Sequence, residues 1–105
     1  MPCAPDCRGA DLAGAVLTNL NLNRVNLVNA DFTDATLNGV SLVGADLTGA
    51  DLSHANLNGA DLRGADLSYT TMVSAYLGSA ILTGAVMVDI QGCDDSLRLP
   101  DCYLD

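Results

Sequence analysis

Residues 45–67 read ADLTGADLSHANLNGADLRGADL, a stretch in which one five-residue pattern repeats without a break. Working outward from it, a large apolar residue occupies every fifth position from Leu12 to Met87, sixteen positions in all. Two positions before each of them stands a residue that is usually small, and it is Ala in twelve of the sixteen cases. The chain therefore repeats with a period of five from residue 10 to residue 89.

A period of five suits neither common secondary structure. On an α-helix, a step of five residues turns by about 140°, so the Leu residues would appear on every face. On a flat strand, the same step moves the side chain to the opposite face each time. The spacing instead predicts a chain that turns a corner every five residues. The large and the small residue then both point inward, and Gly, Asn and Asp supply the backbone angles of the corners.

The units ADLTG at 45–49, ADLSH at 50–54 and ADLRG at 60–64 resemble the A(D/N)LXX unit of the pentapeptide-repeat family. The resemblance covers sixteen consecutive units, from residue 10 to residue 89. It implies an all-β fold, a right-handed quadrilateral β-helix with four pentapeptides per coil. Sixteen units then make about four coils, and at β spacing they form a rod roughly 19 Å long.

This resemblance divides the chain into three parts. Residues 1–9 form an N-terminal cap, residues 10–89 form the pentapeptide-repeat solenoid, and residues 90–105 form a C-terminal cap. Because a solenoid must cover the apolar end of its last coil, we expect the C-terminal tail to lie over that end. Asp94, Asp95 and Ser96 could begin a helical turn in this tail, which Pro100 would end.

The composition excludes several classes of protein. All 13 acidic residues are Asp, Lys and Glu are absent, and the net charge is −9. Direct binding to nucleic acid or to an anionic membrane requires clustered basic residues, which this chain lacks. A chain that is 50% hydrophobic is too apolar to be disordered. The lack of Glu and Lys argues against an ordinary helical bundle.

Four sides per coil predict that residues twenty positions apart stack on one another. Leu20 then stacks on Val40 and enlarges one interior side. Asp34 lies beneath His54 at a corner. One outward column of carboxylates, which we consider a possible electrostatic contact surface, contains Asp11, Asp31 and Asp51.

The segment 67–88 carries no charge over 22 residues, which is long enough for a transmembrane helix. The five-residue pattern continues through it and no basic cluster flanks it, so we interpret it as the fourth coil rather than a membrane span. Its outward positions are apolar, and such a band usually packs against something. The tail or a second subunit could cover this possible interaction surface, which consists of Val73, Tyr76, Ile81, Val86 and Val88.

The four cysteines lie only at the two ends of the chain. In a rod of this length, Cys3 and Cys7 are roughly 19 Å or more from Cys93 and Cys102, whereas a disulfide requires Cα atoms within about 7 Å. If the rod forms, the possible pairing is Cys3–Cys7 with Cys93–Cys102, and a metal site with all four ligands is excluded. The alternative is free, buried thiols. No signal peptide follows Met1, so a targeting segment was removed or the chain was shortened.

His54 is the single His and could act as a general base or a metal ligand beside Asp34. The interpretation that we favour is a solvated corner residue, since one His and one carboxylate are too few ligands for zinc. The rows of Asp lack a loop that would wrap a calcium ion with carbonyl groups. No Ser/His/Asp motif, phosphate-binding loop or dinucleotide fingerprint is present, so we predict no catalytic residue, metal or cofactor.

These observations predict a non-catalytic repeat scaffold, an interaction or structural module for an unknown protein partner, as a monomer or an end-to-end homodimer. Disulfides would place it outside the cytosol, in a periplasm, a thylakoid lumen or a secreted fluid, and lumenal or secreted family members have similar caps; a cytoplasmic protein is the alternative. The resemblance also implies a second function, because one branch of the family mimics DNA and binds the type II topoisomerase gyrase. Duplex DNA carries roughly eleven charges over 19 Å, close to the net charge of −9 of the chain.

Overall fold

Corners at every fifth residue determine the path of the chain. The computed structural model describes residues 2–92, and within them φ is positive at each of the seventeen positions spaced five apart from Gly9 to Asp89. At a typical corner, the Ala15 amide donates to the Leu12 carbonyl at 3.0 Å across a four-residue turn. A positive φ at the third residue alone is typical of a type II β-turn. The predicted corners are therefore type II turns.

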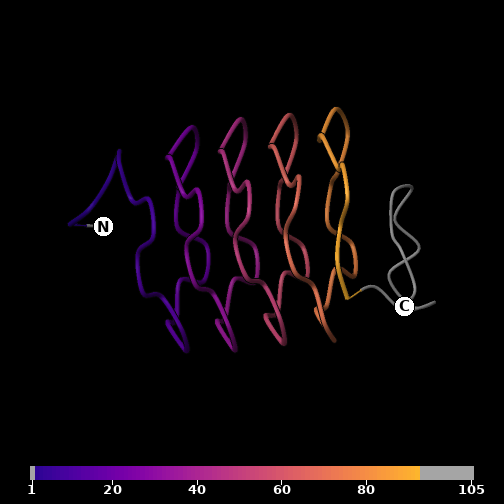
Figure 1. Ribbon diagram of the computed structural model, residues 1–105, viewed down its shortest axis with the longest axis horizontal. Helices are drawn as coiled ribbons and strands as arrows, with labels where there is room; N and C mark the ends of the chain where they lie inside the picture. The colour runs from indigo at the N-terminus through magenta and orange to yellow at the C-terminus, as the bar shows by residue number, and fades with distance from the viewer. Residues whose placement is uncertain (1, 93–105) are drawn as a thin grey trace.

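Parallel β-bridges join the residues that precede the inward Leu positions to the residues twenty positions later. They run from Asp6↔Asn26 to Thr71↔Gln91, and residues 2–92 contain no helix and no strand longer than one such bridge. Because corners recur every five residues and bridges every twenty, each coil has four sides. The chain is a right-handed quadrilateral β-helix, as predicted. Its coils stack side by side along the long axis in Figure 1, as coil 1 (6–25), coil 2 (26–45), coil 3 (46–65), coil 4 (66–85) and a final segment (86–92).

The four sides are numbered here from the first bridge. Side 1 begins at Asp6 and its stacked partners, side 2 at Asp11, side 3 at Val16 and side 4 at Asn21. Each side therefore collects one five-residue unit from every coil. The bridges also show that the coils begin at Asp6, four residues before the boundary expected at residue 10.

Backbone hydrogen bonds join each coil to the next at three points per unit. On side 1, the Leu47 amide donates to the Asp66 carbonyl at 2.8 Å, and the Gly49 amide to the Ser68 carbonyl at 2.9 Å. In the opposite direction, the Asp66 amide donates to the Ala45 carbonyl at 2.9 Å. This pattern repeats around all four sides, so the coils satisfy one another's backbone groups as a parallel sheet does.

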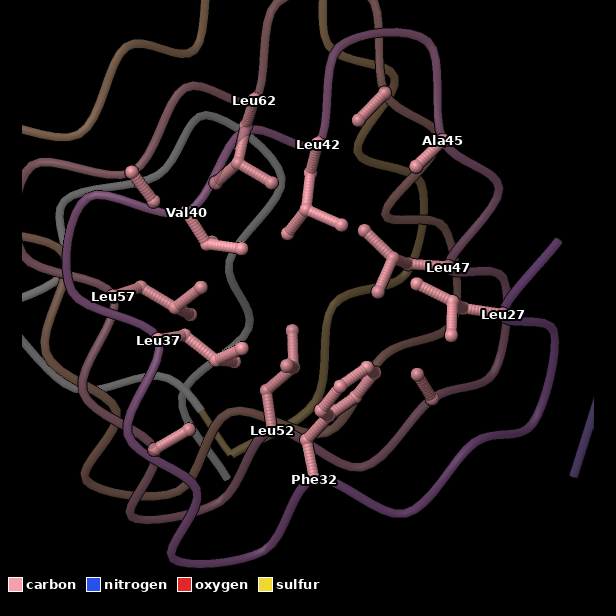
Figure 2. Packing of buried hydrophobic residues seen from close by; sticks show 14 of the residues in the cluster. Leu27, Phe32, Leu37, Val40, Leu42, Ala45, Leu47, Leu52, Leu57 and Leu62 are labelled. Carbon is pink, nitrogen blue, oxygen red and sulfur yellow. The ribbon is translucent and has the colours of Figure 1, made fainter. Parts of the chain in front are cut away.

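Leu and Ala side chains fill the interior, as the five-residue pattern predicts. Figure 2 shows them pointing from all sides toward the axis of the coil. Phe32 is fully buried between the coils, and so are Leu47, Leu52 and Leu57. Burying a Leu side chain stabilises a fold by roughly 1.5–3 kcal/mol. Because the inward residues recur at every side, this contribution accumulates along the entire rod.

The two ends of the described rod are less well covered than its middle. Leu20 was expected inside, stacked on Val40, but it is 42% exposed whereas Val40 is buried. The reason is that Leu20 lies in coil 1, where its outer edge has no bridge to a preceding coil. At the other end, Leu77, Leu82 and Met87 are only partly buried. The expected cap at 90–105 lies mostly outside the described residues.

Candidate functional site

Where Asp or Asn precedes an inward residue, its side chain has a structural role that sequence reasoning missed. Its side-chain oxygen accepts a hydrogen bond from the amide two residues later, as Asp46 does from Thr48 at 3.0 Å and Asn56 from Asn58 at 3.0 Å. These corner amides have no backbone acceptor among the hydrogen bonds between coils. The local Asx turn therefore satisfies a group that the coil geometry leaves free. The frequency of Asp in the repeats could have suggested this role.

The predicted acidic column forms as expected. Asp11 bridges to Asp31, and Asp31 bridges to Asp51, so the three carboxylates stand one above another on side 2. Asp11 and Asp31 are exposed, and Asp51 is half-buried. The Thr33 hydroxyl and amide donate to Asp31 at 2.6 and 2.9 Å. These two hydrogen bonds, the one from the hydroxyl first, lower the pKa of Asp31 below its ordinary value.

Charge is distributed unevenly around the rod. Among the described residues, sides 1 and 2 carry eight of the nine Asp and only one Arg, so their formal charge is −7. Within residues 6–92, side 3 carries no charged residue, and side 4 carries Arg24, Asp61 and Arg63. The chain therefore presents an acidic half and a half that is nearly neutral. This segregation follows from the twenty-residue register.

Two Asp–Arg pairs lie on the surface within single units. Arg63 Nη2 lies 2.6 Å from Asp61 Oδ2, and Arg8 Nη2 lies 2.8 Å from Asp6 Oδ2. Hydrogen bonds from the Arg side chain are the main reason that the pKa of each carboxyl lies below its ordinary value. Both pairs are local and both Arg side chains are exposed, so the pairs contribute little to stability.

The predicted apolar surface does not form one flat patch. Tyr76 lies on side 3, Ile81 on side 4 and Val86 on side 1, while Val73 and Val88 lie at corners. All five are exposed, Tyr76 most of all at 59%. They encircle the C-terminal end of the rod. A partner that binds against one side of the rod therefore cannot contact all five.

Exposed apolar residues also occur where the sequence analysis did not place them. Val16 is 74% exposed on side 3 of coil 1, and Leu20 lies at the end of the same unit. Tyr69 is exposed at a corner, where its φ is 62°. Their five-residue register could have identified Val16 and Tyr69 as outward residues, because only the Leu and Ala positions point inward.

The register places Asp34, His54 and Ser74 at successive positions of one corner, an order that invites comparison with a hydrolase triad. All three are exposed, and within residues 2–92 no hydrogen bond or ion pair joins their side chains. Nucleophile activation requires a base within hydrogen-bond reach and exclusion of water. The three residues accordingly form a solvated corner column, which agrees with our interpretation of His54.

The cysteines near the N-terminus are bonded to each other. Cys3 and Cys7 form a disulfide with a Cα–Cα distance of 5.0 Å. Cys93 and Cys102 lie outside the described residues, so their pairing stays a prediction. In the described part of the chain, no three His, Cys, Asp or Glu side chains are grouped as a metal ion would require.

The uncharged segment 67–88 forms coil 4 and the start of the final segment. Between residues 2 and 92, none of the backbone forms a helix of the length and hydropathy that crossing a membrane requires. The prediction that this segment is a coil is therefore confirmed.

Comparisons with known proteins agree with this geometry. The family model for pentapeptide repeats matches residues 6–44 and 45–84, in eight copies. A pentapeptide repeat protein from the thylakoid lumen of Arabidopsis thaliana is 35% identical, with a TM-score of 0.55 over 89% of this chain and 71% of that chain. One from Nostoc is 34% identical, with a TM-score of 0.62 over 96% of this chain and 85% of that chain. A search of curated protein sequences gave no match.

Proposed function

This chain belongs to the pentapeptide repeat family, and we propose that it is a non-catalytic scaffold that binds a protein partner through its outer surface. The observation that carries the proposal is the segregation of charge. The interior is filled by Leu and Ala side chains, whereas sides 1 and 2 present a formal charge of −7 next to an uncharged side 3. A partner with a basic surface fits the acidic half, since complementary charge guides association and orientation.

Asparagine substitutions test the acidic half without disturbing the fold. Asn26 and Asn56 already accept the corner hydrogen bond that Asp accepts elsewhere, at 3.1 and 3.0 Å. The triple variant D11N/D31N/D51N therefore removes charge and keeps the corners. We expect it to lose a partner that the unaltered protein captures from its native compartment, at matched salt concentration. The matched control is D61N on side 4, which should retain that partner.

The apolar ring around coil 4 and the start of the final segment is the second proposed contact. The variant Y76S/I81T/V86T removes three exposed apolar groups on three different sides. Loss of capture in Y76S/I81T/V86T, with unchanged capture by D11N/D31N/D51N, would place the partner at the C-terminal end of the rod. If both variants and D61N capture the same proteins as the unaltered chain, the surface-binding proposal is wrong.

The DNA-mimic hypothesis finds less support in the distribution of charge. Coils 1–4 contain eight Asp and three Arg, a formal charge of −5, against roughly eleven charges on duplex DNA of the same length. Part of the total charge of −9 lies beyond the coils. Salt-dependent binding to a type II topoisomerase, abolished in D11N/D31N/D51N, would favour this function over a general scaffold.

We place the protein outside a reducing cytosol. The Cys3–Cys7 disulfide supports this proposal, because such bonds persist in oxidising compartments. The 35% identity to a thylakoid-lumen protein agrees with it. Localisation of the tagged full-length protein in its source organism, by cell fractionation, tests the proposal, and recovery in the cytosolic fraction alone would contradict it.

A further inference from the structure

Cys7 occupies a position that elsewhere in the rod belongs to Leu. It begins the interior column that continues through Leu27 and Leu47, and only 1% of its surface is exposed. Its amide donates to the Asn26 carbonyl at 2.7 Å, which fixes the residue within coil 1. Cys3 lies outside the coils and is only partly buried. The two sulfur atoms of this disulfide are therefore in unequal environments.

Thiol–disulfide exchange requires a thiolate to reach one sulfur while the other leaves as a thiolate. Cys3 is the more exposed residue of the pair, so we take its Sγ as the target and Cys7 Sγ as the leaving group. In the intact coil, that charge would form among Leu side chains, where an unpaired charge is costly. Among residues 2–92, the Arg nearest in sequence is Arg8, which is exposed and is held by Asp6 at 2.8 Å. The closed coil thus opposes the release of Cys7 as a thiolate, although Cys3 is the more accessible residue.

We propose that Cys3 is the thiol-exchange site of this protein, and that coil 1 must open locally before a dithiol reductant can complete the reaction. The reductant's first thiolate attacks Cys3 Sγ, the Cys3–Cys7 bond breaks, and Cys7 leaves and takes up a proton. The second thiol of the reductant then attacks the mixed disulfide and releases Cys3 as a thiol. The disulfide is reduced by two electrons, and the dithiol is oxidised to its own disulfide.

Reduction should release the N-terminal segment and leave the later coils in place. The Pro5 carbonyl accepts the Asn26 amide at 2.8 Å, so residues 2–5 supply one hydrogen bond to coil 2. The backbone hydrogen bonds between coils 2, 3 and 4 involve only residues of those coils. This redox property of the N-terminal end does not depend on the proposed partner.

The experiment measures the rate at which dithiothreitol reduces Cys3–Cys7 in the full-length protein. Free thiols are alkylated at intervals and assigned by peptide mapping, which separates this pair from Cys93 and Cys102. We expect reduction at least about tenfold slower than in denaturing urea, and a rate that stops increasing at high dithiothreitol concentration because opening becomes limiting. Glutathione should form its mixed disulfide at Cys3 and not at Cys7.

A matched pair of variants separates local opening from global unfolding. Leu27 stacks directly on Cys7, and Leu67 occupies the same interior column two coils later. L27A should accelerate reduction at least about tenfold, whereas L67A should accelerate it far less; L27V replaces L27A if that variant does not fold. Equal acceleration by both variants would overturn the proposal. So would a reduction rate that stays proportional to the dithiothreitol concentration until it reaches the rate in urea. Glutathione bound to Cys7 would also contradict it.

Discussion

Coils 3 and 4 follow the same backbone path with different outward residues. In coil 3, the residues before the four inward Leu are Asp46, Asp51, Asn56 and Asp61, and each accepts a hydrogen bond from its own corner amide. In coil 4, the corresponding residues are Asp66, Thr71, Tyr76 and Ile81, and among them Asp66 alone accepts such a bond. The two coils nevertheless stack by the same backbone hydrogen bonds.

The difference shows how the corner amides of a coil find hydrogen-bond acceptors where the coil lacks Asp residues. The Gly78 amide in coil 4 donates to Asn58 Oδ1 of coil 3 at 2.8 Å. In the same way, the Val88 amide donates to the Ser68 hydroxyl of the coil below at 3.3 Å. A corner amide is thus satisfied by its own unit or by the unit twenty residues earlier. Coil 4 can carry apolar outward residues partly because coil 3 supplies this acceptor.

The largest expected effect comes from placing a charge inside each coil. L47D buries an unpaired carboxylate in the middle of the rod. It should lower the free energy of unfolding by about 3 kcal/mol or more. L82D should cost much less, because Leu82 is only partly buried in coil 4. Urea unfolding followed by circular dichroism measures both. Equal losses would show that the interiors of the two coils are equivalent.

A smaller effect is expected at the corners, where the two coils use different residues. Gly64 in coil 3 has a φ of 67° and no atom within 4 Å of an added Cβ, so G64A changes only the backbone preference. It should lower the free energy of unfolding by about 1–2 kcal/mol. Ser79 in coil 4 already adopts a φ of 59°, and S79A should have little effect. A similar loss in both variants would mean that side-chain contacts, rather than φ, determine the result.

The hydrogen bond from the Gly78 amide to the Asn58 side chain can be removed by a single substitution. N58A should lower the free energy of unfolding by about 1 kcal/mol, because the Gly78 amide loses its acceptor. Hydrogen exchange of that amide should become faster than exchange elsewhere in coil 4. N38A is the matched control: Asn38 occupies the same column one coil earlier, and its side chain has no hydrogen bond within residues 2–92. Unchanged exchange at Gly78 would contradict the role of Asn58.

The smallest effect concerns the acidic column, which ends before coil 4. Asp31 has a lowered pKa because Thr33 donates to it. Its stabilising contribution is therefore present above the ordinary pKa of Asp and is lost as the pH falls through the lowered value. In T33V, the pKa measured by NMR should move back toward the ordinary value while the Thr33 amide hydrogen bond remains. A pKa that does not move would assign the shift to the backbone.

The coil and its interior could be predicted from the sequence because each five-residue unit places a large and a usually small residue inward. Sixteen large residues at a spacing of five have no other common solution, and this regularity identified Phe32 and Leu47 as buried. Leu20 was placed wrongly because periodicity describes the interior of an infinite rod. It gives no information on which coil lies at an end, where an inward side chain meets solvent.

The functional surface was only partly predictable. The stacking of Asp11, Asp31 and Asp51 follows from the period once the number of sides is known. The bond from Gly78 to Asn58 did not follow, because it depends on which corner amides remain free after all local bonds have formed. The exposed apolar residues of coil 4 and the final segment were identified individually. Their distribution around the end of the rod depends on the side that each occupies.

Corners recur every five residues, whereas a full coil takes twenty. This difference affects how such a chain changes in evolution. Insertion or deletion of one five-residue unit preserves the inward Leu and Ala pattern, so the interior remains filled. Every outward residue after the change moves to the neighbouring side, because each coil still contains four units. Gain or loss of single units can thus rearrange charge and apolar groups over the surface with no substitution. Gain or loss of four units alters only the number of coils and keeps every residue on its side.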